Sequence, residues 1–344
     1  MGRLAELKLA MATSIYLVAL IFALFLSAIM LILRLSLIYA LIGTIIFILI
    51  QYLIGPAIVK SSTRLRYLET GENPWLESTV KELADKAGLP TPKLAIVPDK
   101  TPNAFVFGRT AKSATLAVHE GLLLNLNAEE IRAVIGHELG HLKHKDYIVM
   151  TMLSALPLLA YLIARATWEA GRLAPSSRKR DESNVKAAFF AVAMISYLVY
   201  IVSLLCVRGL SRLREHYADA YSAYLTGSLR SLQSALSKIT YGLSLSPKPP
   251  SGTRAFYIGD PATAKLEISS IIAKKEEYDL DRDGVLDERE LELAMEKEAK
   301  STWTKINTWF STHPPTFKRI LLLREIEREM ESGRFVAERI YAHI

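Results

Sequence analysis

Two long stretches without any charged residue lie near the start of the chain, and they limit its possible folds more than any other feature. They cover residues 9–33 and 35–59, and each is long enough to cross a lipid bilayer as an α-helix. A third uncharged run covers residues 187–207, and a shorter one covers residues 148–164. A cleavable signal peptide does not fit the first run, because the run is too long and a second one follows at once. The sequence therefore predicts a multi-pass membrane protein with four spanning helices.

Basic residues beside the apolar runs indicate which side of the membrane the rest of the chain occupies. If all four runs cross, Lys60, Lys143 and Arg208 share one side with the basic residues near them. The positive-inside rule makes that side cytoplasmic, so we expect a cell-membrane protein in which residues 60–146 and 208–344 face the cytoplasm. Residues 165–186, which connect the last two runs, also carry Arg and Lys and would lie outside. Either the rule fails at this connection, or the last two runs do not both cross.

The charge and the cysteine content exclude other classes of protein. The net charge is +7 in 344 residues. No basic patch with interleaved aromatic residues accompanies it, so we attribute the charge to residues beside the membrane and expect no nucleic-acid partner. Cys206 is the single cysteine, so no internal disulfide can form. The lipid bilayer is the first expected partner.

The segment His137-Glu138-Leu139-Gly140-His141 carries the clearest chemistry of the chain. It lies in a predicted helix over residues 128–145, in which two histidines four residues apart share a face and can reach one metal ion. Nitrogen ligands at this spacing suit zinc. Glu138 lies beside them, where a carboxylate can hold a water at the metal and take its proton. The segment therefore predicts one zinc ion per chain, with His137 and His141 as ligands and Glu138 as general base.

A second predicted helix, over residues 208–228, offers a third ligand. Glu215 and Asp219 are four residues apart and share a face of this helix. A catalytic zinc site with two histidines needs a third protein ligand, commonly a carboxylate from a later helix. Glu215 is the candidate, and Asp219 would accept a hydrogen bond from a ligand histidine and fix its tautomer. The alternative is that these acids belong to a solvated charged face together with Arg212 and Arg214.

Short β-like segments precede the helix with the two histidines. They cover residues 93–97, 104–108 and 115–118, with turn residues between them, and they predict a small antiparallel sheet next to that helix. A free sheet edge could hold an extended peptide by backbone pairing. The candidate substrate-binding residues at this edge are Asn103, Ala104 and Phe105. The alternative is a sheet that only supports the helix.

Taken together, these motifs resemble the M48 family of integral-membrane zinc metalloproteases, in particular its bacterial and archaeal HtpX branch. The matching segments are residues 102–105, 120–123, 137–141 with Asp146, 214–219 and 313–315. The resemblance implies a mainly α, membrane-embedded helical fold of the zincin type, with the small sheet beside the helix of the two histidines.

The resemblance also assigns roles to individual residues. It implies that His137, His141 and Glu215 bind zinc and that Glu138 is the catalytic base, with Asp219 as a supporting residue. His313 is the candidate donor of a hydrogen bond to the oxyanion that forms from the scissile carbonyl. His119 and His216 stand where the family often has other residues. His216 could compete with Glu215 for the metal, but it points about 100° away around the helix.

A second metal motif lies at residues 279–290, which match the EF-hand loop at its diagnostic positions, including Gly284 at the turn. The candidate calcium ligands, in loop order, are Asp279, Asp281, Asp283, the backbone carbonyl of Val285, Asp287 through a water, and Glu290. The motif is not part of the common protease pattern and resembles an insertion. No second loop follows it, so we expect a structural calcium ion rather than a sensor. The alternative is an acidic turn without an ion.

These features predict a membrane-bound zinc endopeptidase that degrades misfolded or damaged membrane proteins. We expect two N-terminal transmembrane helices in residues 1–59 and two further ones in residues 147–207. The cytoplasmic catalytic domain would consist of residues 60–146 and 208–344.

Two other functions fit parts of the sequence. One is a CAAX-type processing protease for prenylated proteins, which belongs to the same family; the smaller number of spans argues against it. The other is a calcium-responsive membrane protein without catalytic activity, such as a scaffold or transporter. The complete set of His137, Glu138 and His141 argues against that class, as does the lack of charged residues inside the spans.

Overall fold

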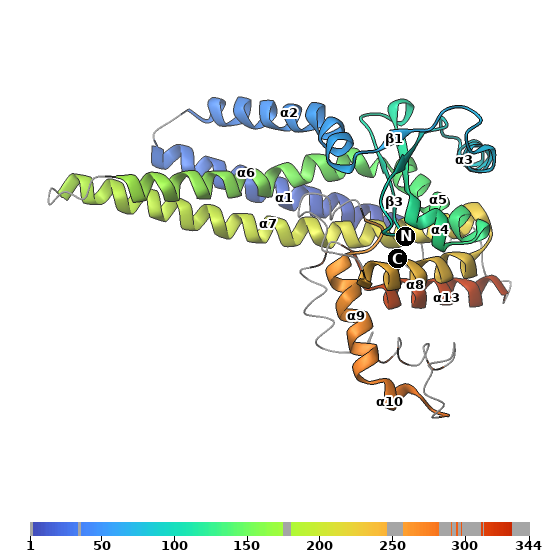
Figure 1. Ribbon diagram of the computed structural model, residues 1–344. Helices are drawn as coiled ribbons and strands as arrows, with labels where there is room; N and C mark the ends of the chain where they lie inside the picture. Colours follow the sequence, from blue (N-terminus) through green and yellow to red (C-terminus); the bar gives the residue numbers. More distant parts are fainter. Residues whose placement is uncertain are drawn as a thin grey trace. The chain divides into compact units, whose positions relative to one another are not determined.

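A computed structural model describes residues 3–33, 36–174, 180–245, 257–281, 290, 294, 297, 311 and 313–331. The chain forms two compact units, and we describe each by itself. One unit consists of Lys8–Gly55 and Ile148–Leu210 and holds most of the apolar helices (Figure 1). The other consists of Met1–Leu7, Pro56–Tyr147 and Ser211–Ile344 and holds the sheet and the histidine pair.

Four long helices carry the apolar runs. They are α1 (Arg3–Leu33), α2 (Leu37–Thr63), α6 (Asp146–Leu173) and α7 (Arg180–Thr226). Within the described residues, α2, α6 and α7 contain segments long and apolar enough to cross a membrane, whereas α1 contains the shorter apolar segment Ala19–Met30. Three of the predicted spans are therefore confirmed as helices that can cross, and the span in α1 stays a prediction.

The apolar helices pack through one face and leave the other uncovered. Phe22 and Phe25 of α1 are buried in a cluster with Leu153 of α6 and Val207 of α7. Along α2, by contrast, large apolar side chains are exposed, among them Leu49. An apolar face of this length is unfavourable in water and suits the acyl chains of a bilayer.

Helix α7 is continuous, whereas the sequence predicted an apolar run and a separate helix from residue 208. Its 47 residues correspond to a length of about 70 Å. Gly209 lies where the two predicted elements meet, and one glycine inside a helix costs only about 1 kcal/mol. The same helix therefore contains a membrane-capable segment and both Glu215 and Asp219.

The sheet has four strands in the order β1-β2-β4-β3. The strands are β1 (Arg66–Tyr67), β2 (Lys93–Val97), β3 (Ala104–Phe107) and β4 (Thr115–His119). β1 pairs with β2 and β3 pairs with β4 in antiparallel fashion, but β2 and β4 are parallel. The prediction of an antiparallel sheet was wrong for this central pair. The connection between β2 and β3 carries the chain past the position of β4, so the β3–β4 hairpin places β4 beside β2 in the same direction.

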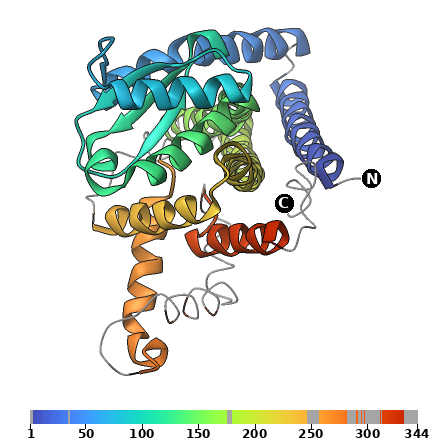
Figure 2. The same ribbon diagram turned by 90° about the vertical axis from the view of Figure 1, so that its right-hand side faces the viewer.

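The unit that holds the sheet also contains several helices. They are α3 (Pro74–Ala87), α4 (Glu120–Asn125), α5 (Ala128–Lys143), α8 (Leu229–Leu245), α9 (Pro261–Ala273), α10 (Lys275–Tyr278) and α13 (Thr316–Glu331), with the 3-10 turn η1 (Ala111–Ser113) between β3 and β4. One apolar core joins α3, the sheet, α5, the end of α7, α8 and α13. Helix α8 packs against both α9 and α13 (Figure 2).

Candidate metal centre

Helix α5 presents the histidine pair, and its start is firmly held. Asn127 and Glu130 form a reciprocal capping box, with the Glu130 N–H 2.9 Å from Asn127 Oδ1 and the Asn127 N–H 2.8 Å from Glu130 Oε2. Glu130 is buried and also accepts hydrogen bonds from Ser234 and Lys238 of α8. These contacts fix the position of α5 against α8 before the chain reaches His137.

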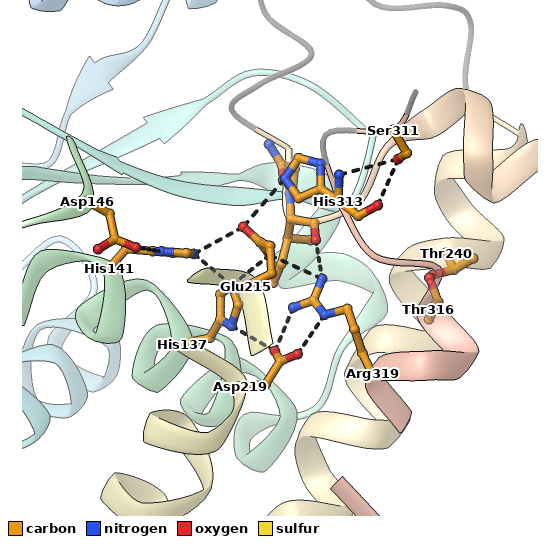
Figure 3. A network of polar contacts seen from close by, with 12 residues as sticks. His137, His141, Asp146, Glu215, Asp219, Thr240, Ser311, His313, Thr316 and Arg319 are labelled. Atoms are coloured by element: carbon orange, nitrogen blue, oxygen red, sulfur yellow. Dashed lines mark hydrogen bonds and ion pairs between the residues drawn. The ribbon is translucent and has the colours of Figure 1, made fainter. Parts of the chain in front are cut away.

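Three potential ligand side chains converge at the centre of the site (Figure 3). His137 Nε2 and His141 Nε2 are 3.1 Å apart. Glu215 Oε2 lies 3.6 Å from His137 Nε2, and Glu215 Oε1 lies 3.4 Å from His141 Nε2. A tetrahedral ion with bonds of about 2.0–2.1 Å separates its ligand atoms by about 3.3 Å. The three side chains therefore stand at the spacing that a bound metal ion requires.

The opposite nitrogen of each histidine ring contacts a carboxylate. His137 Nδ1 lies 2.9 Å from Asp219 Oδ1, and His141 Nδ1 lies 2.7 Å from Asp146 Oδ2. A proton on each Nδ1 satisfies these contacts and leaves both Nε2 lone pairs facing the centre. This arrangement fixes the tautomer that a metal ion needs and raises the basicity of the ligand nitrogen.

Each supporting carboxylate is in turn held by a buried arginine. Arg214 donates to Asp146 and also to the backbone oxygen of His144. Arg319 donates to both oxygens of Asp219, at 2.8 and 2.6 Å, and to the backbone oxygen of Ile258 at 2.5 Å. Two charged pairs thus anchor the ring orientations of the histidines from behind.

Glu138 faces the free edge of the sheet. Its Oε2 accepts a hydrogen bond of 3.0 Å from the backbone N–H of Val106 in β3, which is the edge strand of the sheet. The side chain is buried, and burial raises the pKa of its carboxyl above the usual range. The Glu138 carboxylate therefore lies between α5 and β3, the strand at the edge of the sheet.

His313 enters the site from the segment just before α13. Its Nε2 lies 3.7 Å from Glu215 Oε1, and burial lowers the pKa of its ring while the Glu215 carboxylate acts in the opposite direction. The hydroxyl of Ser311 donates to the backbone oxygen of His313 at 2.8 Å and fixes the local chain. The structure thus places His313 beside Glu215, and its role as an oxyanion donor stays a prediction.

The known proteins that are similar to this chain identify its family. Residues 70–327, well over half of the chain, match the family model described as peptidase family M48. The chain belongs to peptidase family M48. A Protease HtpX homolog from Methanothermobacter thermautotrophicus is 40% identical over 206 residues, which are 60% of this chain and 74% of that protein. Relatives of the same name from Thermococcus sibiricus and Moorella thermoacetica are 35% identical over 283 residues and 33% identical over 296 residues.

The matches to the Thermococcus and Moorella proteins extend over most of this chain and most of each relative. It covers 81% of this chain and 83% of the Thermococcus protein, and 85% of this chain and 86% of the Moorella protein. Among solved structures, Ste24p of S. mikatae is similar with a TM-score of 0.47 and 20% identity. That match covers 92% of this chain and 64% of Ste24p, so the chain spans less than two thirds of that protein. Family, relatives and membrane-capable helices together make this chain an M48 membrane metalloprotease.

Close helix packing brings the third potential ligand of this M48 peptidase to the histidines. A methyl group at Gly140 of α5 would lie 3.2 Å from the Cα of Ala218 in α7, which is tighter than ordinary contact. About two turns earlier in α5, the backbone oxygen of Ala133 accepts a hydrogen bond of 2.6 Å from the hydroxyl of Ser222 in α7. Glycine at position 140 therefore favours the close approach of α7 that places Glu215 beside the histidines, because a methyl group there would require α7 to shift by a few tenths of an ångström.

Other residues singled out in the M48 sequence lie near the centre but have different surroundings. His216 is partly buried and is not a member of the ligand cluster. Asn103 is also buried, and its side chain accepts from the Ile258 N–H at 2.9 Å and lies 3.4 Å from His119 Nε2. Ala104 and Phe105 begin the edge strand β3 itself. The supporting roles of Asp146, Arg214 and Arg319 were not predicted.

Part of the EF-hand motif is also described. Asp279, Asp281 and Glu290 each place a carboxylate oxygen within 4.8 Å of the others. Glu290 Oε1 accepts hydrogen bonds from the N–H groups of Leu280 and Asp281, at 2.5 and 3.2 Å. The remaining candidate ligands Asp283, Val285 and Asp287 lie outside the described residues. The calcium site stays a prediction.

Proposed function

We propose that this chain is a zinc-dependent endopeptidase that uses Glu138 as its general base. The observation that carries the proposal is the spacing of His137 Nε2, His141 Nε2 and Glu215, between 3.1 and 3.6 Å. Two imidazoles and one carboxylate form a donor set of the kind found at catalytic zinc. Asp146 and Asp219 hold the two rings with their Nε2 atoms inward.

The side chains around the centre divide the steps of peptide hydrolysis among them. Zinc, when bound, supplies Lewis-acid chemistry that polarises a carbonyl and makes water a stronger nucleophile. Glu138 takes the proton of the attacking water and passes it to the leaving amine. His313, on the far side of Glu215, donates a hydrogen bond to the oxyanion. Burial of Glu138 excludes bulk water from this proton transfer.

The open edge of β3 is the proposed binding place for the substrate backbone. The Val106 N–H points from this edge to Glu138, so a chain paired with the backbone of Ala104, the neighbouring position that faces the same edge, would pass directly beside the general base. Backbone pairing at a sheet edge requires an extended substrate segment. Such a segment is available in chains that are locally unfolded, which favours misfolded or damaged proteins as substrates.

The membrane helices and the family favour substrates from the membrane itself. We place the chain in the cell membrane, with the catalytic unit on the cytoplasmic side by the positive-inside rule. Processing of prenylated CAAX proteins is the competing function within the family. Cleavage of unfolded casein, but not of a farnesylated CAAX peptide, would favour degradation of misfolded proteins. The reverse result would favour processing of prenylated CAAX proteins.

The decisive experiment separates catalysis from metal binding. Glu138→Gln should abolish casein cleavage and retain bound zinc, because the base is lost and the ligands remain. Glu129→Gln, an exposed carboxylate of the same helix, serves as the control and should cleave normally. Cleavage near the normal rate by Glu138→Gln would exclude Glu138 as the base.

We further propose that residues 279–290 bind one calcium ion. The spacing of the motif and the described positions of Asp279, Asp281 and Glu290 support a hard-oxygen site. Such a donor set suits calcium and not zinc, which prefers the histidine centre. Calorimetric titration of the purified protein with calcium tests this proposal.

A further inference from the structure

A cavity of about 500 Å³ lies between α8, α9 and the start of α13. Apolar side chains form most of its wall, including Leu245, Ile271 and Phe317. Leu245 and Tyr241, at its margin, are largely exposed. The volume is within the usual range for a bound organic group.

One carboxylate lies in this apolar wall. Glu267 is only 8% exposed, and both of its carboxylate oxygens accept the backbone N–H of Thr316, at 3.0 and 3.2 Å. Among the residues that the structure describes, no basic side chain pairs with it. Lys238 lines the same cavity but lies 2.7 Å from Glu130, its own partner. A buried carboxylate without a cation in an apolar wall favours a ligand that brings the cation.

The surroundings of Glu267 determine the pKa of its carboxyl. Burial raises the pKa of its carboxyl to about 7, the Thr316 N–H and Arg319 act in the opposite direction, and Asp260 adds to the increase. Near neutral pH a substantial fraction of the carboxyl is therefore ionised. A cation beside it would stabilise the ionised form.

We propose that this cavity binds a lysine or arginine side chain of the polypeptide substrate. The aliphatic stem of such a residue suits the walls formed by Leu245, Ile271 and Phe317, and its charged end suits Glu267. An acidic side chain would be repelled, and a purely apolar one would leave the carboxylate without a cation. The proposal rests on the proposed peptidase function and names a preference of the same site.

Two residues of the cavity wall belong to segments that also contribute to the proposed substrate path. Thr316, in its wall, is three residues from His313, and its hydroxyl lies 2.8 Å from that of Thr240 in α8 (Figure 3). Gly242 of α8 also lines the cavity and packs so closely on Pro102, just before the edge strand, that an added methyl would lie 2.5 Å from its ring. The segment that leads into β3 therefore packs on a helix that forms the cavity wall.

Paired peptides test this preference with the full-length protein in detergent and zinc. The two peptides of a pair are identical except for one position, which carries lysine in one and the uncharged norleucine in the other. A series of such pairs places this position at successive residues on both sides of the cleaved bond. At one position, kcat/KM should be at least about 10-fold higher for the lysine peptide, as expected for one charge-assisted hydrogen bond.

Glu267→Gln removes the charge but keeps an oxygen that can accept from the Thr316 N–H. This variant should lose the lysine preference and cleave the norleucine peptide at about the normal rate. Glu325→Gln, at an exposed position of α13, is the matched control and should keep the preference. In the unmodified protein, the lysine-to-norleucine ratio of kcat/KM should rise between pH 6 and pH 8, because a cation binds the ionised carboxylate; in Glu267→Gln it should stay constant.

A binding measurement separates failure of the cavity from failure of the peptidase. Fluorescence anisotropy with the labelled peptides compares Glu138→Gln with the double variant Glu138→Gln/Glu267→Gln, so no cleavage is needed. Tighter binding of the lysine peptide to the first and equal binding of both peptides to the second supports the cavity. A lysine preference that persists without the Glu267 charge, or no preference at any position, overturns the inference. Absence of cleavage by the unmodified protein would instead count against the proposed function.

Discussion

Arg319 and Asp219 are 100 residues apart in the chain and meet through two hydrogen bonds of 2.8 and 2.6 Å behind the metal centre. Arg319 is 1% exposed, and Asp219 is fully buried. Asp219 in turn orients His137, at 2.9 Å. The orientation of a metal-facing histidine on α5 thus depends on a residue of α13, the helix that follows His313.

The first prediction concerns this pair. Arg319→Met should destabilise the fold by about 3–5 kcal/mol, because it leaves the Asp219 carboxylate buried without a cation. It should also weaken zinc binding, while Arg319→Lys should have an intermediate effect, since lysine keeps the charge but loses the planar two-point contact. Melting temperature and zinc affinity of both variants test this. Normal zinc affinity in Arg319→Met would show that Asp219 orients His137 without help.

The second prediction separates a ligand from the residue behind it. Glu215→Ala should lose zinc, because one of three ligands is removed. Asp219→Asn should keep zinc and lose activity or affinity by about 10- to 100-fold, as is typical when a partner of a ligand histidine is altered. Metal analysis after dialysis and casein cleavage distinguish the two. Equal zinc content in Glu215→Ala and the unmodified protein would assign the third ligand to another group, with His216 as the first candidate.

The third prediction concerns the contact of α5 with α7. Gly140→Ala places a methyl group 3.2 Å from the Cα of Ala218, so the helices must separate, at a cost of about 1–3 kcal/mol. Zinc affinity should fall as well, because Glu215 moves away with α7. Gly55→Ala is the control, since an added methyl there has no atom within 4 Å among its neighbours. Similar melting temperatures and zinc affinities for both variants would contradict the close-packing argument.

The sequence predicted those parts of the site that local spacing determines. His137 and His141 follow from the helical period, and Glu215 follows from the need for a third ligand on a later helix. Arg319 depends on a contact 100 residues away, which no local pattern contains. One signal was present: Arg319 lies in a helix whose neighbouring positions Phe317, Ile320 and Leu323 are apolar and buried, and a charge there needs an acidic partner.

The sequence also did not predict which strands of the sheet are parallel. Alternation and turn residues predicted β2, β3 and β4 within a few residues of their ends. They contain no information on which strands become neighbours. The path of the chain from β2 to β3 decides that β4 is parallel to β2, and this path depends on tertiary packing.

The fourth prediction concerns acid stability. Burial lowers the pKa of His119 to about 4, while Asp99 and the Thr101 carbonyl act weakly in the opposite direction. The unfolded chain, with an ordinary histidine pKa of about 6.5, therefore binds the proton more readily than the folded one. The stability contributed by the neutral ring is fully present above pH 6.5 and is lost as the pH falls towards 4, by about 2 kcal/mol between pH 7 and pH 5.

His119→Phe should remove this part of the pH dependence, although it lowers the stability at pH 7 because the ring nitrogens no longer contact Thr101 and Asn103. Thermal melts of both proteins at pH 7 and pH 5 measure the difference in slope, and contributions from the metal centre are common to both. The same loss of melting temperature on acidification in both proteins would contradict a buried neutral His119.

The last prediction concerns calcium. Glu290 Oε1 already accepts the N–H groups of Leu280 and Asp281, so the twelfth position of the loop lies against its start. In an EF-hand, this glutamate provides two ligand oxygens, whereas the ninth position acts through water. Glu290→Gln should therefore weaken calcium binding more than Asp287→Asn does.

Calcium at one hundred times its dissociation constant should stabilise the fold by about 2.7 kcal/mol. Melting curves in millimolar calcium and in chelator test this for the unmodified protein and both variants, with zinc content as the control that must not change. Identical curves in calcium and chelator, together with no heat of binding, would reduce the loop to an acidic turn.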